Sequence, residues 1–349
     1  MTSRFARALS ICCACGTAQA SDNPAERYLN AHEAYAQATC PIADTDITHF
    51  VYFARDRDAV RGHPLLTSAR FEGAQIMYPW RQLEPQRGVY DFSEIRADIA
   101  YLNSFGKMLF LQLQDASFNP DFKPVPDYLL DAAYGGGVTA QYLDTGEIEG
   151  WVAKRWSPEV QARFAALLDA LGAEFDGVIA GINLQESIIG VSMETDPSFS
   201  PAPYAEALKT NMRALKTAFP SVTTLQYANF MPGEWLPWED EGFLRGIYAF
   251  GEEIGVGLGA PDLMVQRKGQ LNHALAMMHE QSFTAPLGIA VQDGNYIGQT
   301  NTQKRVTDRQ NIVPLLHAFA DDFLKVDYMF WSNQEPYFAE DVLPCMQGE

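Results

Sequence analysis

Residues 92–114 read FSEIRADIAYLNSFGKMLFLQLQ and predict one amphipathic helix followed by one apolar strand. In residues 92–105, apolar side chains recur at helical spacing, with Ser93 as the expected N-cap and Gly106 as the stop. Residues 107–114 are short and almost continuously apolar, which indicates a buried strand. A helix that leads into a buried strand is the unit from which helix-covered parallel sheets are built.

The same alternation of apolar strand and helix continues along the chain. Strand-like runs begin near residues 47, 73, 107, 178, 222, 255, 287 and 326, and helical patterns cover residues 65–71, 92–105, 158–175, 204–218, 242–253, 269–280 and 311–324. Residues 25–38 also look helical but lie outside the alternation. Eight such units predict an α/β protein with one closed (β/α)8 TIM barrel, spanning residues 21–349 as a single domain.

An open, doubly wound sheet is the alternative architecture. It would usually carry a glycine-rich phosphate loop that opens a helix after an early strand. The glycine run at residues 135–137 lies in a long insertion and opens no helical pattern, so the barrel is favoured.

The first twenty residues have the features of an export signal. Arg4 and Arg7 precede a short apolar stretch, and Ala18-Gln19-Ala20 is an A-x-A cleavage pattern, which predicts a secreted or periplasmic protein. The chain carries a net charge of −19, and loss of a segment with two arginines and no acid would make it −21. This charge disfavours nucleic acid and anionic membranes as partners. The mature sequence contains no apolar run of roughly 20 residues, so no membrane span is expected.

Five cysteines are present, and three of them fall within the predicted signal. The remaining two, Cys40 and Cys345, precede the first strand and follow the last, so an exported protein is expected to bridge them and join the ends of the barrel. Two free buried thiols are the alternative. Cysteine–histidine metal spacing is missing, and neither a metal nor another cofactor is expected.

Catalytic residues of barrels of this kind lie at the C-terminal ends of the strands. The residues that follow the predicted strands are acidic, amide-bearing and aromatic, a mixture suited to sugars, because carboxylates supply acid/base chemistry and amides hydrogen-bond hydroxyls. We expect Glu186 and Asp293 to be catalytic. The expected substrate-binding residues are Tyr78, Trp80, Arg81, Asp115, Gln185, Tyr227, Asn229, Tyr296, Trp331, Asn333 and Glu335.

Oxygen ligands for calcium or magnesium are an alternative use of four of these acids. Asp115, Glu186, Asp262 and Asp293 follow four different strands. No histidine and no D-x-D-x-D loop accompanies them, which disfavours a metal site.

One segment after the second strand resembles a known family. Residues 78–92 (YPWRQLEPQRGVYDF) are similar to the W-x-x-L-E-P-x-x-G-x-Y-D-F segment of clan A glycoside hydrolases, above all their beta-galactosidase-like and cellulase-like members. The rest of the chain matches only in layout. The resemblance implies a TIM barrel with a general acid/base glutamate after the fourth strand, where Glu186 falls, and a tryptophan ending the eighth, where Trp331 falls. It also implies that Arg81 lies near the carboxylates and keeps the nucleophile ionised.

The sequence departs from the family pattern at two places. Gln185 stands where the clan usually has an asparagine before its acid/base, and Asp293 stands where the clan nucleophile is a glutamate ending the seventh strand. The shorter side chain of Asp293 is compatible with an altered backbone, an inverting mechanism or a lost activity. Glu335 is the rival second carboxylate.

These observations predict hydrolysis of a glycosidic bond in a neutral polysaccharide or oligosaccharide. Glu186 would protonate the leaving oxygen, and Asp293 would attack the anomeric carbon or activate a water. The insertion at residues 116–156 would shape the substrate cleft, and a monomer is expected. A non-catalytic carbohydrate-binding barrel is the main alternative. A lyase using Tyr227 or Tyr296 as base is a further one, which the negative charge disfavours.

Overall fold

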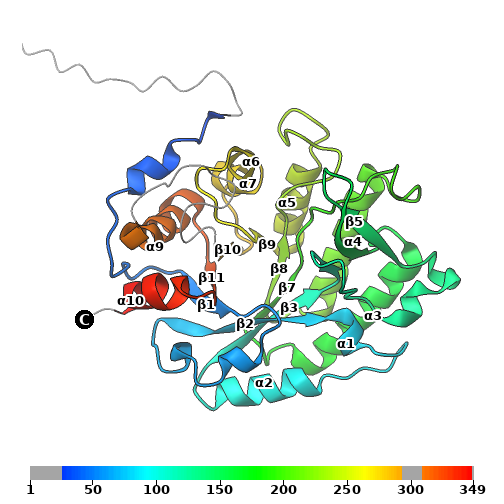
Figure 1. The fold of residues 1–349 in the computed structure, drawn as a ribbon, viewed down its shortest axis with the longest axis horizontal. Coiled ribbons are helices and arrows are strands. Elements are labelled where there is room, and N and C mark those ends of the chain that lie inside the picture. Colours follow the sequence, from blue (N-terminus) through cyan, green and yellow to red (C-terminus); the bar gives the residue numbers. More distant parts are fainter. Residues whose placement is uncertain (1–25, 293–308, 348–349) are drawn as a thin grey trace, which may run out of the picture.

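The computed structural model describes residues 26–292 and 309–347, and its centre is a closed barrel of parallel strands (Figure 1). Around the barrel the strand order is β1-β11-β10-β9-β8-β7-β3-β2. The strands are β1 (Thr48–Tyr52), β2 (Phe71–Pro79), β3 (Met108–Gln114), β7 (Gly181–Leu184), β8 (Thr223–Tyr227), β9 (Gly257–Ala260), β10 (Leu287–Val291) and β11 (Tyr328–Ser332). The predicted (β/α)8 barrel is confirmed, with each expected strand present in its place.

Helices connect the strands and cover the outside of the barrel. The main ones are α2 (Ser93–Asn103), α3 (Pro158–Phe175), α4 (Pro201–Ala218), α5 (Phe243–Ile254), α6 (Lys268–Asn272), α7 (Ala274–Glu280) and α9 (Arg309–Ala318), with the short α1 (Trp80–Leu83) after β2 and α10 (Leu343–Met346) near the C-terminus. They pack apolar faces on strands whose outward side chains are also apolar, which is why the strands lack polar alternation.

Four predicted helical segments differ from the structure. Residues 269–280 form two helices, because the backbone of His273 leaves helical geometry. The helix predicted over 311–324 changes to π-helical winding at Phe319. Of the helix predicted over 25–38, the structure describes residues 26–38, which form turns and 3-10 winding, with a 3-10 helix at Ala31–Tyr35. Residues 65–71 contain the end of a single 3-10 turn before β2 begins. Ser93 is the first residue of α2 rather than its N-cap, and its N–H donates to Asp91 Oδ1 at 3.0 Å.

The barrel interior has an aromatic floor. The ring centroids of Phe110 lie 5.4 Å from Phe50 and 4.9 Å from Phe330, and all three rings are fully buried. A glycine at position 181 makes room for this floor, since a Cβ there would lie 2.6 Å from the Phe110 ring. Because side chains of a strand alternate, the residue two places beyond Phe110 faces the interior again, and that residue is Gln112. Polar residues therefore begin directly above the floor.

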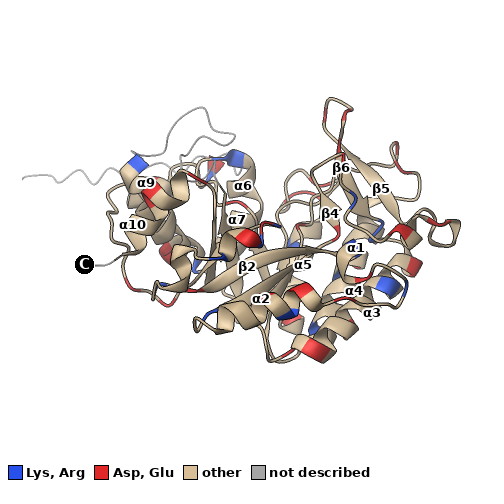
Figure 2. Cartoon of the chain, turned by 60° about the horizontal axis from the view of Figure 1, so that its bottom comes forward, with Lys and Arg blue, Asp and Glu red and all other residues tan. Residues whose placement is uncertain are grey.

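The insertion after β3 forms a separate antiparallel sheet. Its strands are β4 (Ala116–Ser117), β5 (Val138–Tyr142) and β6 (Ile148–Ala153), in the order β4-β6-β5. Figure 2 shows this sheet on the same side of the molecule as α3 and α4. Because β4 follows β3 almost immediately, the insertion begins at the rim of the barrel.

The two ends of the described chain are joined as predicted. Cys40 and Cys345 form a disulfide across a sequence separation of 305 residues. Next to it, the Ile42 N–H donates to the Cys345 carbonyl at 3.0 Å. Within the described residues, none of the helices is both long and apolar enough to cross a bilayer.

Candidate active site

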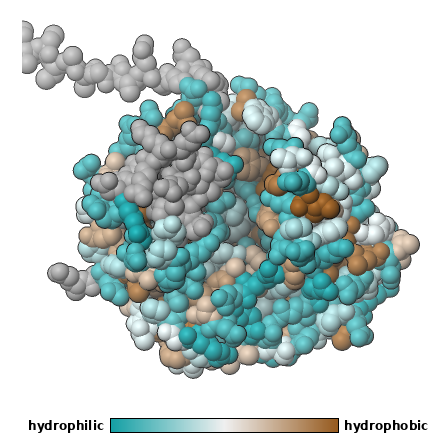
Figure 3. Space-filling model, viewed as in Figure 1, coloured by the Kyte–Doolittle hydropathy of each residue, from teal (hydrophilic) through white to brown (hydrophobic). Residues whose placement is uncertain are grey.

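A cavity of about 180 Å³ opens above the aromatic floor, at the C-terminal ends of the strands. Figure 3 shows the surface hollowed toward the middle of the face drawn in Figure 1. Amide and hydroxyl side chains dominate its wall, and one carboxylic acid joins them: the polar lining residues are Tyr52, Gln75, Gln112, Gln114, Ser117, Gln185, Glu186, Tyr227 and Gln292. Ser117 and Phe118 come from the insertion, which therefore shapes the cavity as predicted.

Glu186 is the acid in this wall, and it follows the last residues of β7. Its Oε2 accepts a hydrogen bond of 2.6 Å from the Asn229 side-chain amide. The orientation of that amide is fixed, because Asn229 Oδ1 accepts from the N–H groups of Ile188 at 3.2 Å and Phe230 at 3.0 Å. The NH2 group of Asn229 is therefore held toward the carboxyl group of Glu186.

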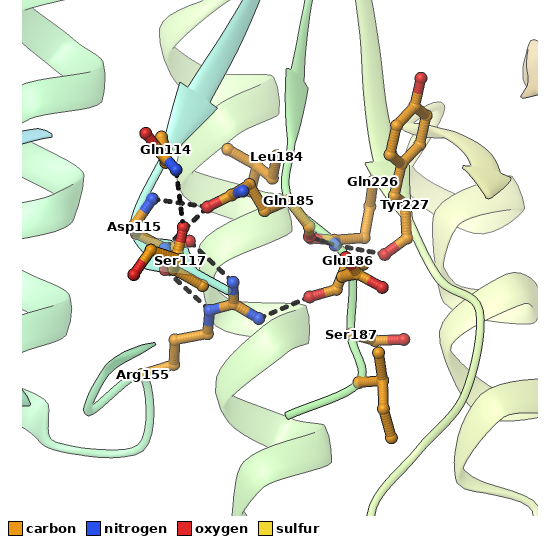
Figure 4. Close-up of polar contacts among 12 residues, drawn as sticks. Gln114, Asp115, Ser117, Arg155, Leu184, Gln185, Glu186, Ser187, Gln226 and Tyr227 are labelled. Carbon is orange, nitrogen blue, oxygen red and sulfur yellow. Dashed lines mark hydrogen bonds and ion pairs between the residues drawn. The ribbon is translucent and has the colours of Figure 1, made fainter. Parts of the chain in front are cut away.

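A buried arginine holds the backbone on the other side of Glu186 (Figure 4). Arg155 makes two hydrogen bonds of 2.7 Å to the carboxylate of Asp115. It also donates to the Glu186 carbonyl at 2.8 Å and to the Tyr204 hydroxyl at 3.0 Å. The Tyr204 hydroxyl in turn donates to the Ser187 carbonyl at 2.7 Å. Arg155 thus connects the end of β3 to the two peptide groups that position the candidate acid.

Glutamines complete the support of the same segment. Gln185 Oε1 accepts from the backbone N–H groups of Asp115 at 2.9 Å and Ala116 at 2.7 Å. Gln226 Nε2 donates to the Gln185 carbonyl at 2.6 Å. Gln185, the residue before Glu186, is therefore tied to the end of β3 and to β8.

The surroundings favour the protonated form of Glu186. Burial raises the pKa of this carboxyl group from an ordinary 4.5 to about 7, with a smaller contribution from the negative charge of Asp262. The hydrogen bond from Asn229 and the charge of Arg155 act in the opposite direction. A carboxylic acid with a pKa near 7 can hold a proton at neutral pH and also release it, as a general acid must.

Three of the predicted substrate-binding residues belong to the cavity region. Gln185 and Tyr227 line it, and Asn229 binds Glu186. The side-chain oxygen of Gln185 accepts hydrogen bonds from the backbone of Asp115 and Ala116, so its NH2 group is the part that can contact a substrate.

Three predicted aromatic contacts are buried elsewhere and do not reach the cavity. The Tyr78 hydroxyl donates to Asp98 in α2 at 2.7 Å, and Trp80 donates to Glu84 at 2.9 Å and packs on Phe164 in α3. Trp331 donates to His49 at 3.1 Å. All three side chains are fully buried between strands and helices, so the predicted substrate contact at these positions is wrong, and their role is packing.

Four predicted polar contacts are also placed differently. Among the described residues, the ion-pair partner of Arg81 is Asp127 and not Glu186. Both oxygens of Asp115 are taken by Arg155, so this residue supports the site without facing it. Asn333 Oδ1 lies 3.1 Å from His63 Nε2, and Glu335 is exposed and accepts from the Ala339 N–H. Neither Asn333 nor Glu335 lines the cavity.

Asp293 and Tyr296 lie outside the described residues, so their predicted roles stay predictions. Within residues 26–292 and 309–347, no group of three or more metal-ligating side chains occurs.

Several residues of the site were missed in the sequence. They are Tyr52, Gln75, Gln112 and Gln114 on the cavity wall, and Arg155 and Tyr204 behind it. For the glutamines a signal existed, because an amide inside an otherwise apolar strand is unusual. Arg155 gave none, since its partners lie 40 and 49 residues away in sequence.

Comparison with known proteins supports the fold. No protein family profile and no curated protein sequence matches the chain. Among solved structures, the catalytic domain of beta-amylase from Paenibacillus polymyxa aligns with a TM-score of 0.54 and 9% identity, over 88% of this chain and 96% of that one. GH5_18 from Bifidobacterium longum aligns with a TM-score of 0.53 and 13% identity, over 82% and 70%. A family 39 glycoside hydrolase from Bacteroides cellulosilyticus aligns with a TM-score of 0.50 and 13% identity, over 83% and 57%.

The chain thus shares a closed (β/α)8 barrel fold with these three solved structures. At 9–13% identity the likeness concerns the course of the backbone, and a shared fold does not imply a shared reaction.

Proposed function

We propose that this protein is a glycoside hydrolase in which Glu186 donates a proton to the oxygen of the glycosidic bond. The observation that carries the proposal is the position of Glu186: it faces the cavity at the C-terminal end of β7, with a pKa raised to about 7. The fold adds support by analogy only.

The surroundings of Glu186 suit a group that loses a proton during the reaction. As the proton moves to the leaving oxygen, negative charge develops on the carboxyl group. Asn229 already donates to that group at 2.6 Å, and Arg155 lies close enough to lower its pKa. Both interactions strengthen as the carboxylate forms, and neither has to move to do so.

Asp293 is the proposed second carboxylate. It follows Gln292, which lines the cavity, directly in sequence. It would either attack the anomeric carbon or activate a water. The anomer released distinguishes the two, because attack by a carboxylate leads to retention and attack by water to inversion.

A neutral sugar chain is the proposed substrate, and the proposed location is outside the cytoplasm. The described lining residues of the cavity include no lysine, arginine or histidine that could bind an anionic sugar. The export-like first twenty residues and the Cys40–Cys345 disulfide support secretion or a periplasmic location.

The test compares the wild-type protein with Glu186→Gln on a panel of neutral and acidic polysaccharides, with reducing ends as the readout. Loss of a general acid should lower hydrolysis of the best substrate by roughly 100-fold or more. Glu335→Gln is the matched control, because Glu335 is exposed and outside the cavity, and it should hydrolyse like the wild type. Full activity of Glu186→Gln would refute the assignment.

A non-catalytic carbohydrate-binding barrel is the second candidate. It is favoured by one observation: Glu186 is the sole carboxylic acid among the described residues that line the cavity. This candidate predicts that calorimetry detects sugar binding by both the wild type and Glu186→Gln, while neither releases reducing ends from any polysaccharide of the panel.

A further inference from the structure

Among the residues that the structure describes, two buried side-chain oxygens in the cavity wall have no hydrogen-bond partner. They are Oε1 of Gln112 and Oε1 of Gln114, and each of these side chains is 5% exposed and lines the cavity. Nearly all buried polar atoms in folded proteins have a partner, because a buried acceptor that has lost water and gained nothing is costly. Two such oxygens in one cavity therefore point to a ligand that supplies the donors.

The orientation of Gln114 identifies the oxygen as its free atom. Its Nε2 donates to the Ala116 carbonyl at 3.0 Å, and turning the amide over would bring two oxygens together. Gln114 stands at the upper rim of the barrel beside Gln185 and Asp115 (Figure 4). Its free oxygen is thus an acceptor at the level of the candidate acid.

Gln112 places a second acceptor deeper in the same wall. Residues two apart on a strand face the same side, so Gln112 and Gln114 both face the barrel interior. Their backbones are separated by roughly 7 Å along the strand, which is two residues of rise. Gln112 stands one level above the floor residue Phe110. A ligand that reaches the floor therefore passes both amides.

We propose that Gln112 and Gln114 are specificity-determining residues that accept hydrogen bonds from hydroxyl groups of a neutral sugar residue in this cavity. An amide oxygen only accepts, so its partner must carry a proton, and sugar hydroxyls do. The inference rests on the proposed function for its choice of a sugar, but it does not require that the bound sugar is hydrolysed.

The same wall disfavours a uronic acid. At neutral pH a carboxylate has no proton to donate, so it would place its own acceptors against the two glutamine oxygens. It would also find no countercharge among the described lining residues. Arg155 lies behind the wall, bound to Asp115, and Arg55 stacks on Phe122 at 4.0 Å in a neighbouring recess that shares Met77 with the cavity.

The test measures binding by titration calorimetry, with Glu186→Gln as the parent protein so that no substrate is consumed. The probes are cellobiose, xylobiose, mannobiose and galactobiose, with digalacturonate as the acidic counterpart. Gln112→Met and Gln114→Met remove the oxygens at similar side-chain length. Gln270→Met is the matched control, because Gln270 is also buried with an unpartnered Oε1 but lies in α6, away from the cavity.

We expect at least one neutral disaccharide to bind, and digalacturonate to bind at least tenfold more weakly. Gln112→Met and Gln114→Met should each weaken binding of the neutral sugar by about 3- to 10-fold, the effect of one lost hydrogen bond, and Gln270→Met should not. Unchanged binding by both cavity variants, equal binding of digalacturonate, or no binding of any probe by the parent would overturn the proposal. Sugar binding that follows this pattern in a wild type that hydrolyses nothing would refute the hydrolase and leave this inference standing.

Discussion

Replacing Arg155 by methionine should strongly destabilise the protein, although Arg155 does not line the cavity. Arg155 and Asp115 are 4% and 5% exposed, so the substitution leaves a buried carboxylate without its countercharge. It also removes the donors to the Glu186 carbonyl and the Tyr204 hydroxyl. Breaking a buried ion pair from one side costs about 3–5 kcal/mol, and we expect a fall in the free energy of unfolding within this range.

Urea unfolding followed by circular dichroism measures that fall, with two comparisons. Arg96→Met breaks an ion pair whose side chains are 56% and 36% exposed, and it should cost less than about 1 kcal/mol. The double variant Arg155→Met/Asp115→Leu removes both charges, so it should be more stable than Arg155→Met alone. If Arg155→Met costs no more than Arg96→Met, the reasoning that Arg155 anchors the site is refuted.

Three further predictions concern single groups. Asn229→Ala removes a hydrogen-bond donor to the carboxylate of Glu186 and should raise its pKa by about one to two pH units. The alkaline limb of the pH–rate profile should then move to higher pH. Asn333→Ala, the control, should leave that limb in place. Burial holds the pKa of Glu186 at about 7 in the folded protein, compared with an ordinary 4.5. The wild type should therefore lose about 3 kcal/mol of unfolding free energy relative to Glu186→Gln as the pH rises from 4.5 to 7. Urea unfolding measures this loss, and the same pH dependence in both proteins would contradict it. Cys40→Ala removes the disulfide to Cys345 and should lower the free energy of unfolding by about 5 kcal/mol in the chain-entropy model. Chemical reduction of the wild-type disulfide should have the same effect. An unchanged midpoint of urea unfolding would count against the bridge.

The fold could be predicted from the sequence because its signal is repetitive. Each strand is a short apolar run between helical patterns, as at residues 107–114, and the count of such units fixes the closed barrel. Helix boundaries were less accurate where the backbone changes geometry without a proline or glycine signal, as at His273.

The site could be predicted only in part, because sequence position shows where a strand ends but not where a side chain points. Glu186 and Tyr227 could be predicted from their positions at strand ends, and both line the cavity. Asp115 also follows a strand, but it faces the opposite way from Gln114 and is held by Arg155. Trp331 matches a family position, yet its ring lies outside the barrel against His49.

The alternation of side chains along β3 would have improved the prediction of which residues face the cavity. The run LFLQLQ is buried on both faces, so hydrophobicity alone does not say which residues face inward. The two glutamines give the answer, since an amide is tolerated where a cavity or ligand can receive it.

Titration of Glu186 itself tests its role as the proton donor most directly. Carbon NMR of protein labelled at the glutamate carboxyl carbons would follow each resonance with pH, and comparison with Glu186→Gln would identify the one that belongs to Glu186. Because the carboxyl group of Glu186 is buried, its resonance should titrate with a pKa of about 7. Titration near 4.5, like an exposed glutamate, would mean that Glu186 carries no proton at neutral pH and would contradict its role as the proton donor.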